Sequence, residues 1–127
     1  MTAEEEQDTD LLELATDADN GRVTVVGGVF TDLDARRLEH ELIDAAGTQP
    51  GGTLAVDLSG VTFLPSRAIR SLVMAQRSAS ARGTTLRLLA AEGSLSRRML
   101  RAVGFDVADP VAADEDSQDG PPPWTAS

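Results

Sequence analysis

Residues 54–73, LAVDLSGVTFLPSRAIRSLV, are the stretch that decides how the chain folds. The segment TLAVDLS (residues 53–59) is a short, nearly continuous apolar run, which is typical of a strand buried on both faces. After it, Ser66 can cap a helix that Gly83 ends. The inward stripe of that helix is marked, at helical spacing, by Ile69, Leu72, Val73 and Gln76. The stretch therefore predicts a buried strand, a short link and an amphipathic helix.

Two further helices are predicted, one on each side of this stretch. Asp34 is a candidate N-cap for the segment ARRLEHELIDAAG, and Gly47 supplies its stop. The residues of this helix at core spacing are Ala35, Leu38, Leu42 and Ala45. Ser94 can cap the segment SLSRRMLRAVG. The inward residues of this last helix are predicted to be Leu95, Met99, Leu100 and Val103.

Three more strands complete the predicted sheet. The segment RVTVVGG holds a β-branched strand at residues 22–26, and the turn DADNG joins it to a weaker strand at residues 11–16 as a hairpin. TTLRLLA (residues 84–90) is the mate of the strand at residues 53–59. Two strand–helix–strand units with short connections imply parallel pairing through right-handed crossovers. We therefore expect one α/β domain over residues 10–108, with a mixed sheet of four to five strands and about three helices.

Charge is divided unevenly along the chain. Residues 1–20 hold eight acids and residues 106–127 hold six, with no basic residue at either end. The other 7 acids and all 11 arginines lie in residues 21–105, so this body carries +4 between ends that sum to −14. We expect residues 1–9 and 109–127 to be disordered acidic tails, the second of them Pro-rich.

Composition excludes much of the usual chemistry of protein sites. With no cysteine and one histidine, His40, the chain has no disulfide, thiolate zinc site or multi-histidine metal site. Aromatic residues at 3% and a net charge of −10 argue against a nucleic-acid partner. The acidic N-terminus and the lack of a membrane-spanning apolar run predict a cytoplasmic protein without a membrane partner. We find no nucleophile–base pair and no Gly-rich phosphate loop, and therefore expect no catalytic residue, cofactor or metal.

Residues 54–73 resemble the central signature of STAS domains, the fold shared by bacterial anti-sigma factor antagonists and the cytosolic parts of sulfate transporters. That signature is a strand ending in Asp-Leu-Ser-Gly, a short link and then a helix, and Asp57 through Leu64 follow it closely. Ser66 stands where the antagonists carry their phosphorylatable serine. The resemblance extends over roughly residues 11–107. It implies a STAS-like fold that acts by reversible protein–protein binding and not as an enzyme.

A serine at the start of a helix can serve as a switch. Phosphorylation adds about −1.5 to −2 charges at a point where the helix dipole and free N–H groups tolerate an anion, so the fold survives. A docked partner would meet a hydrated dianion there. The resemblance implies an anti-sigma factor with serine kinase activity as that partner. The residues alone leave open that Ser66 is only a structural cap.

The surface that we expect to bind the partner surrounds Ser66 and the second predicted helix. It comprises Thr31, Asp32, Thr62, Phe63, Leu64, Ser66, Arg67, Arg70 and Arg77. The three arginines fall at spacings that place them on one exposed helix face, which suits an acidic protein, the chain's own tails or simply solvent. We expect a monomer or weak dimer. Asp57 is expected to orient a loop, and His40 to face solvent.

Two other functions remain open. Pro65, Arg67 and Ala68 stand where the family has Asp, a small or hydroxyl residue and Gly. These departures favour a STAS module that is never phosphorylated and acts as a scaffold or subunit, for example in a multi-protein sensor or a lipid-transport complex. The other possibility is a small-molecule or nucleotide sensor, which no residue of the sequence supports.

Overall fold

A hairpin forms one edge of the sheet. In the computed structural model, which describes residues 11–110, β1 (Glu13–Asp17) pairs antiparallel with β2 (Arg22–Gly28). Within the turn, the Asp17 carboxylate accepts hydrogen bonds from the backbone and side chain of Asn20, and Gly21 has a positive φ of 61°. Asx-type bonding and a left-handed glycine are what the turn DADNG offers. The predicted hairpin is confirmed.

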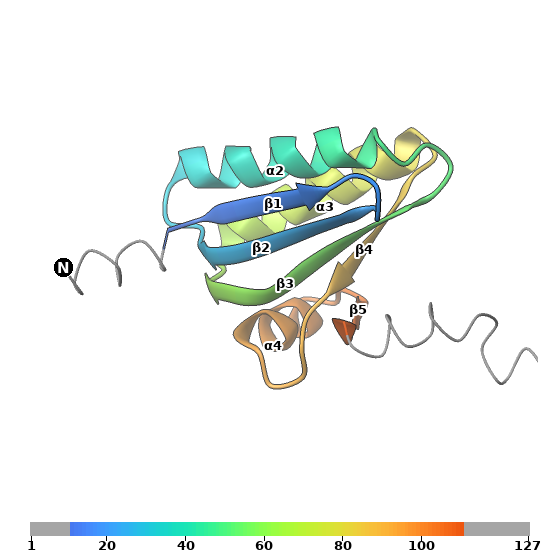
Figure 1. Cartoon of the computed structure of the whole chain (residues 1–127). Helices are drawn as coiled ribbons and strands as arrows, with labels where there is room; N and C mark the ends of the chain where they lie inside the picture. Colours follow the sequence, from blue (N-terminus) through green and yellow to red (C-terminus); the bar gives the residue numbers. More distant parts are fainter. Residues whose placement is uncertain (1–10, 111–127) are drawn as a thin grey trace, which may run out of the picture.

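The remaining strands run parallel. β3 (Thr53–Phe63), β4 (Thr85–Leu89) and β5 (Val107–Ala108) extend the sheet in the order β1-β2-β3-β4-β5. The crossovers carry α2 (Asp32–Ala46), α3 (Ser66–Ala81) and α4 (Leu95–Ala102). Figure 1 shows α2 and α3 on one face of the sheet and α4 on the other. The predicted mixed sheet with an antiparallel edge and three helices is confirmed.

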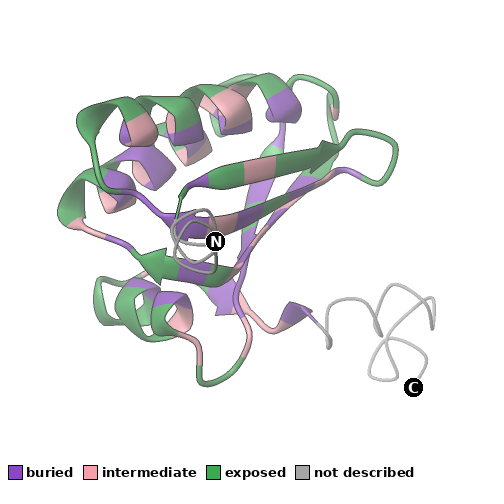
Figure 2. Ribbon diagram, turned by 60° about the vertical axis from the view of Figure 1, so that its left-hand side comes forward, coloured by how far each residue is buried: buried purple, intermediate pink, exposed green. Residues whose placement is uncertain are grey.

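The core lies between the sheet and the α2–α3 layer, where buried residues gather (Figure 2). Alternate residues of β2 and β3 point into it, and each fully buried leucine or valine contributes about 1.5–3 kcal/mol. The largest fully buried side chains of this core include Val23, Val25, Leu38, Leu42, Leu54, Val56, Leu58, Leu72 and Leu88. This core fixes the positions at which α2 and α3 begin.

The two helices of this layer meet through small residues. The buried residues of α3 are Ala68, Ser71, Leu72, Ala75 and Ala79. Ile69, Val73 and Gln76, which were predicted to face inward, are only partly buried. Small side chains let α3 lie close to α2, and the Ser71 hydroxyl donates a hydrogen bond of 2.9 Å to the carbonyl of Ala35. The predicted stripe is confirmed at Leu72, which is fully buried, and at Ile69, which packs against the core, while Gln76 donates a hydrogen bond of 3.4 Å to the carbonyl of Leu86 in β4.

The first turn of α2 is closed by a capping box. Thr31 is the N-cap, and its hydroxyl accepts a hydrogen bond of 3.0 Å from the Asp34 amide. The Asp34 carboxylate in turn accepts hydrogen bonds from the amides of Thr31 and Phe30. The prediction that Asp34 is the N-cap was therefore wrong by one turn, because Asp34 occupies the third helical position of the box.

The third helix, α4, packs on the opposite face of the sheet, mainly against β3. Ser94 caps α4 as predicted, with its hydroxyl accepting from the Arg97 amide at 3.2 Å. The buried Ser96 hydroxyl donates to the carbonyl of Leu58 at 2.6 Å, and Leu100 is fully buried. The prediction that Leu95, Met99 and Val103 face inward was wrong, since they are 40%, 37% and 56% exposed.

Asp, Ser and Gly of the Asp-Leu-Ser-Gly segment of β3 each have a structural role. Asp57 forms an ion pair of 3.1 Å with Arg22 of β2 and accepts a hydrogen bond from the amide of Ser59, so its contacts are structural, but they lie within the strands and not in the expected loop. The Ser59 hydroxyl accepts from the amide of Ala91 at 2.8 Å, which ties the loop before α4 to β3. A Cβ on Gly60 would lie 2.7 Å from a methyl group of Val26, so only glycine fits there.

The predicted tails at residues 1–9 and 111–127 lie outside the described residues. Asp109 and Pro110, which were assigned to the C-terminal tail, are described, and Pro110 is buried. Within residues 11–110, no helix is long and apolar enough to cross a membrane.

Candidate functional site: the mouth of α2 and α3

The candidate site lies at the edge of the sheet where β2 and β3 end. Two loops lead from these strands into α2 and α3, and the amide of Val29 donates a hydrogen bond of 3.1 Å to the carbonyl of Phe63 between them. In parallel sheets, loops at the carboxyl ends of neighbouring strands lie side by side and commonly carry binding sites. Figure 1 shows that both helices begin at this edge.

An apolar patch projects from the two loops. The rings of Phe30 and Phe63 stack with their centroids 5.4 Å apart and an interplanar angle of 18°. They remain 46% and 44% exposed, and Leu33, in the first turn of α2, is 61% exposed. Large exposed apolar side chains that lie together are a feature of protein-binding surfaces. We call Phe30, Leu33 and Phe63 the apolar patch.

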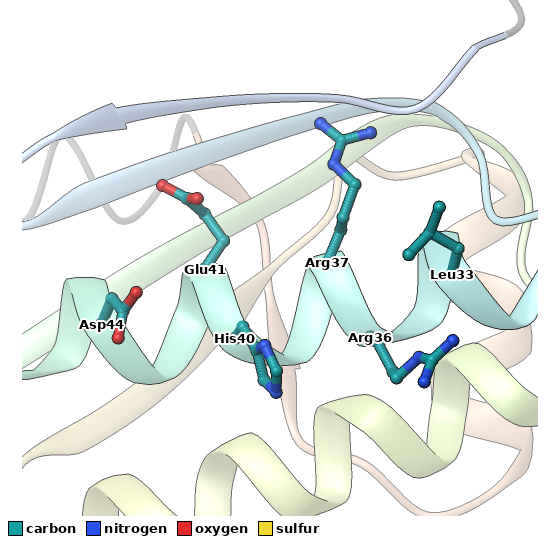
Figure 3. Close-up of a pocket in the computed structure, with 6 residues that line it drawn as sticks. All are labelled: Leu33, Arg36, Arg37, His40, Glu41 and Asp44. Carbon is teal, nitrogen blue, oxygen red and sulfur yellow. The ribbon is translucent and has the colours of Figure 1, made fainter.

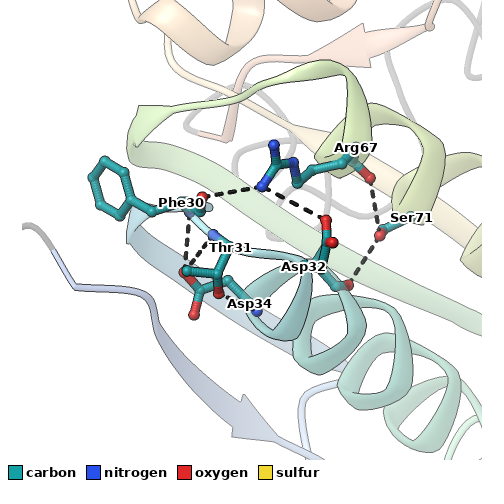
Figure 4. Close-up of polar contacts among 7 residues, drawn as sticks. Phe30, Thr31, Asp32, Asp34, Arg67 and Ser71 are labelled. Carbon is teal, nitrogen blue, oxygen red and sulfur yellow. Dashed lines mark hydrogen bonds and ion pairs between the residues drawn. The ribbon is translucent and has the colours of Figure 1, made fainter.

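Arg67 ties the two loops together from the first turn of α3. Its guanidinium donates a hydrogen bond of 3.1 Å to the carbonyl of Phe30 and lies 3.6 Å from the carboxylate of Asp32 (Figure 4). The pair is exposed, so it contributes at most about 1 kcal/mol to stability. Its effect is to hold the Phe30 loop against the start of α3.

Ser66 directly precedes Arg67, and its hydroxyl does not cap the helix. The N-cap of α3 is Pro65, whose carbonyl accepts from the amides of Ala68 and Ile69, and Ser66 is the first helical residue. Ser66 is exposed, and within residues 11–110 its side chain has no hydrogen-bond partner. The prediction that Ser66 caps the helix was therefore wrong. The reading that Ser66 is only a structural cap loses its basis at the same time.

The structure gathers most of the predicted surface here and separates two residues from it. Exposed side chains close to Ser66 in the fold are Thr31, Asp32, Thr62, Phe63, Arg67 and Arg70. Leu64 is 2% exposed and belongs to the core, because it is the residue that anchors the link between β3 and α3. Arg77 is exposed on α3, but eleven residues of helix place it about 16 Å along the axis from Ser66.

Sequence reasoning missed two members of the patch, Phe30 and Leu33. Phe30 follows the glycine pair that ends β2, and Leu33 lies off the apolar stripe of α2. The signal available in the sequence was a phenylalanine between a strand and a helix cap, followed by a leucine that does not fit the apolar spacing of the helix. The stacking of Phe30 on Phe63 depends on the parallel pairing of β2 with β3, which the sequence pattern does not place to the residue.

Other surfaces offer less to a ligand. A shallow depression on α2 is lined by Leu33, Arg36, Arg37, His40, Glu41 and Asp44. Figure 3 shows that Arg37 and Glu41 point toward the sheet side of α2 and His40 toward α3, so the side chains around this depression diverge. His40 is exposed, as predicted. Among the described residues there is no group of three or more side chains that could hold a metal ion.

Comparisons with known proteins agree with this architecture. A family model described as "Mlab, STAS domain" matches residues 12–111, and the chain therefore belongs to the STAS domain family. An anti-sigma factor antagonist from Mycobacterium paratuberculosis superposes with a TM-score of 0.67 at 20% identity, over 85% of this chain and 94% of that one. The anti-sigma factor antagonist SpoIIAA in its unphosphorylated form gives 0.58 at 14% identity, over 85% and 96%. Among curated proteins there is no significant match.

Proposed function

We propose that this protein is a cytoplasmic anti-sigma factor antagonist, a regulator of transcription that works by binding and not by catalysis. The observation that carries the proposal is the free, exposed hydroxyl of Ser66 at the start of α3, next to the apolar patch. Its partner would be an anti-sigma factor with serine kinase activity, which docks over this edge and releases its sigma factor. The STAS fold, shared with two solved antagonists, supports the general role.

The unphosphorylated surface combines an apolar centre with charged neighbours. The apolar patch would supply the desolvated contacts, as buried aromatic side chains do in interface centres. Arg70 lies one turn from Ser66 on the same side of α3, and Arg67 follows Ser66 directly; both arginines are exposed and suit a partner that presents carboxylates. This arrangement fits a partner with an acidic rim around an apolar pocket.

A phosphate on Ser66 would act on the partner and spare the fold. The first amides of α3 have no acceptors within the helix, and the helix dipole favours an anion at this end. The phosphate would also compete with Asp32 for Arg67, whose side chain ties the Phe30 loop to α3. Loss of about 3 kcal/mol at the interface would weaken binding by more than a hundredfold.

A second function is supported by the local sequence. Pro65 is the N-cap of α3, and Arg67 is already engaged with Phe30 and Asp32. Both replace residues that the phosphorylated antagonists carry, and the matching family model is described by the name Mlab. The alternative is therefore a STAS scaffold or subunit, in a signalling or lipid-transport complex, that uses the same edge without phosphorylation.

Incubation with candidate anti-sigma kinases and ATP, followed by mapping of the phosphate by mass spectrometry, tests the proposal. We expect stoichiometric modification at Ser66 and none in the Ser66→Ala variant. Retained binding to the kinase without any modification would instead support the scaffold. If no candidate kinase binds the protein and none modifies it, the antagonist function is overturned.

A further inference from the structure

The outer surface of α4 carries a second set of apolar side chains that the proposed function does not use. Leu95, Met99 and Val103 follow one another at intervals of four residues, which places them along one side of the helix. They are 40%, 37% and 56% exposed. This stripe lies on the face of the sheet opposite α2 and α3 (Figure 1). An apolar stripe on a helix of eight residues calls for an occupant.

Arginines lie around the helix from the stripe: at about 3.6 residues per turn Arg101 points nearly opposite Met99, and it lines one depression together with Arg97 and Arg98. Arg98 and Arg101 are exposed, and neither forms an ion pair within residues 11–110. Arg97 donates to the carbonyl of Ala90 and lies 4.0 Å from the carboxylate of Asp109. We call Leu95, Arg98, Met99, Arg101 and Val103 together the α4 face. It fits a segment that is both acidic and apolar.

The chain itself supplies such a segment directly after the described fold. Residues 111–127 contain no basic residue and four acids, followed by three prolines and the only tryptophan of the protein, Trp124. The chain passes beside α4 as it enters this segment, because β5 contacts α4 and Asp109 pairs with Arg97. Fourteen residues separate Pro110 from Trp124 and reach up to about 46 Å when extended, several times the length of α4.

We propose that residues 111–127 bind the α4 face of the same molecule, with Trp124 on the apolar stripe and the acids toward Arg98 and Arg101. The three prolines favour the extended polyproline conformation, so less entropy is lost when Trp124 docks. Covalent attachment raises the local concentration of the segment to the millimolar range, about that of a short flexible linker.

Two other occupants fit the observations less well. The N-terminal segment is also acidic, with five acids in residues 1–10, but its only large apolar residue is Met1. It enters the fold at β1, the edge of the sheet opposite β5. A second copy of the chain would bring together two molecules of formal charge −10 and lacks the advantage of attachment.

Fluorescence of the full-length protein tests this inference without any partner, so its outcome is independent of the proposed function. Trp124 is the sole tryptophan and the chain has no tyrosine, so the emission reports on this residue alone. We expect emission at shorter wavelength than that of a peptide of residues 111–127, and weaker quenching by acrylamide. Both values should move to those of the peptide in the Leu95→Ser/Val103→Ser variant, and toward them in Arg98→Glu/Arg101→Glu and at high salt.

A matched control is Leu33→Ser, which removes a leucine that is more exposed than Leu95 from the apolar patch on α2 and should leave the emission unchanged. Circular dichroism confirms that each variant is folded. Peptide-like emission in the wild-type protein would overturn the inference. So would a response to Leu33→Ser in place of the α4 variants, or quenching that depends on protein concentration, which would indicate a second copy.

Discussion

The hydroxyl of Ser66 makes no hydrogen bond to any of residues 11–110, so we expect a charge placed there to affect a partner and not the fold. We expect Ser66→Asp to unfold with a free energy within about 0.5 kcal/mol of the wild type, because a surface substitution at a helix start costs little and the dipole favours an acid. Its affinity for the anti-sigma factor should fall by about a hundredfold, which corresponds to ~3 kcal/mol. Calorimetric titration of the partner measures the loss.

The matched control for this variant is Ser80→Asp, which adds the same charge to an exposed serine in the last turn of the same helix. It should leave the affinity unchanged while costing about 0.3–1 kcal/mol of stability, because an acid is unfavourable at a helix C-terminus. Equal loss of affinity in both variants would mean that net charge, and not the position of Ser66, governs binding.

Thr31 and Ser66 stand at the starts of α2 and α3, but only one of them is a cap. Thr31→Ala removes the hydroxyl that accepts from the Asp34 amide, and should lower the free energy of unfolding by about 1 kcal/mol. Ser66→Ala should change it by less than about 0.5 kcal/mol, since no cap bond is lost. Urea denaturation of the two variants gives both numbers. A comparable loss in Ser66→Ala would restore Ser66 as a cap.

The sequence predicted that Ser66 lies exposed at a helix start, but it could not predict the register of that start. Serine is a far more common N-cap than proline, so the cap was assigned to Ser66. Pro65 takes this place because its φ is fixed near the helical value and its carbonyl accepts the first hydrogen bonds of the helix, one residue earlier than predicted. In α2 the N-cap also lies earlier than predicted, at Thr31 and not at Asp34.

At the scale of elements, the contact between α2 and α3 rests on small side chains. Ala75 is fully buried at this contact, so Ala75→Leu forces extra volume between the helices and should cost about 1–3 kcal/mol. Ala81→Leu, at the exposed end of the same helix, should be nearly neutral. Urea midpoints at equal m-values compare the two, and a neutral Ala75→Leu would show that the layer repacks freely.

Hydrophobic periodicity predicted which segments are helices, and only in part which of their faces are buried. In α3 the pattern of large residues correctly marked Leu72 and Ile69, but it did not mark the alanines and the serine of the buried face, because these residues score weakly as apolar although they permit close packing. In α4 the stripe of large residues points outward, because this helix has one neighbouring layer and docks through Ser96 and Leu100. Periodicity measures amphipathicity and cannot distinguish a core face from a docking face.

At the scale of the whole molecule, the sheet separates two surfaces. The mouth of α2 and α3, with the apolar patch and Ser66, lies at one side, and the α4 face lies on the opposite side of the sheet (Figure 1). The body between residues 21 and 105 carries +4, while the ends carry −14. This division of charge can be read from the sequence. The basic surface that lies nearest to the C-terminal end is known only from the structure, because β5 lies beside α4.

Because the two surfaces share no residue, we expect them to act independently. Substitutions more than about 7–10 Å apart without common partners add to within about 0.5 kcal/mol. The Leu95→Ser/Val103→Ser variant should therefore bind the anti-sigma factor with wild-type affinity, and its combination with Ser66→Asp should match Ser66→Asp alone. Titration of the four proteins closes the thermodynamic cycle. A coupling well above 0.5 kcal/mol would show that the partner reads both faces, so that release of the C-terminal segment is part of the same switch.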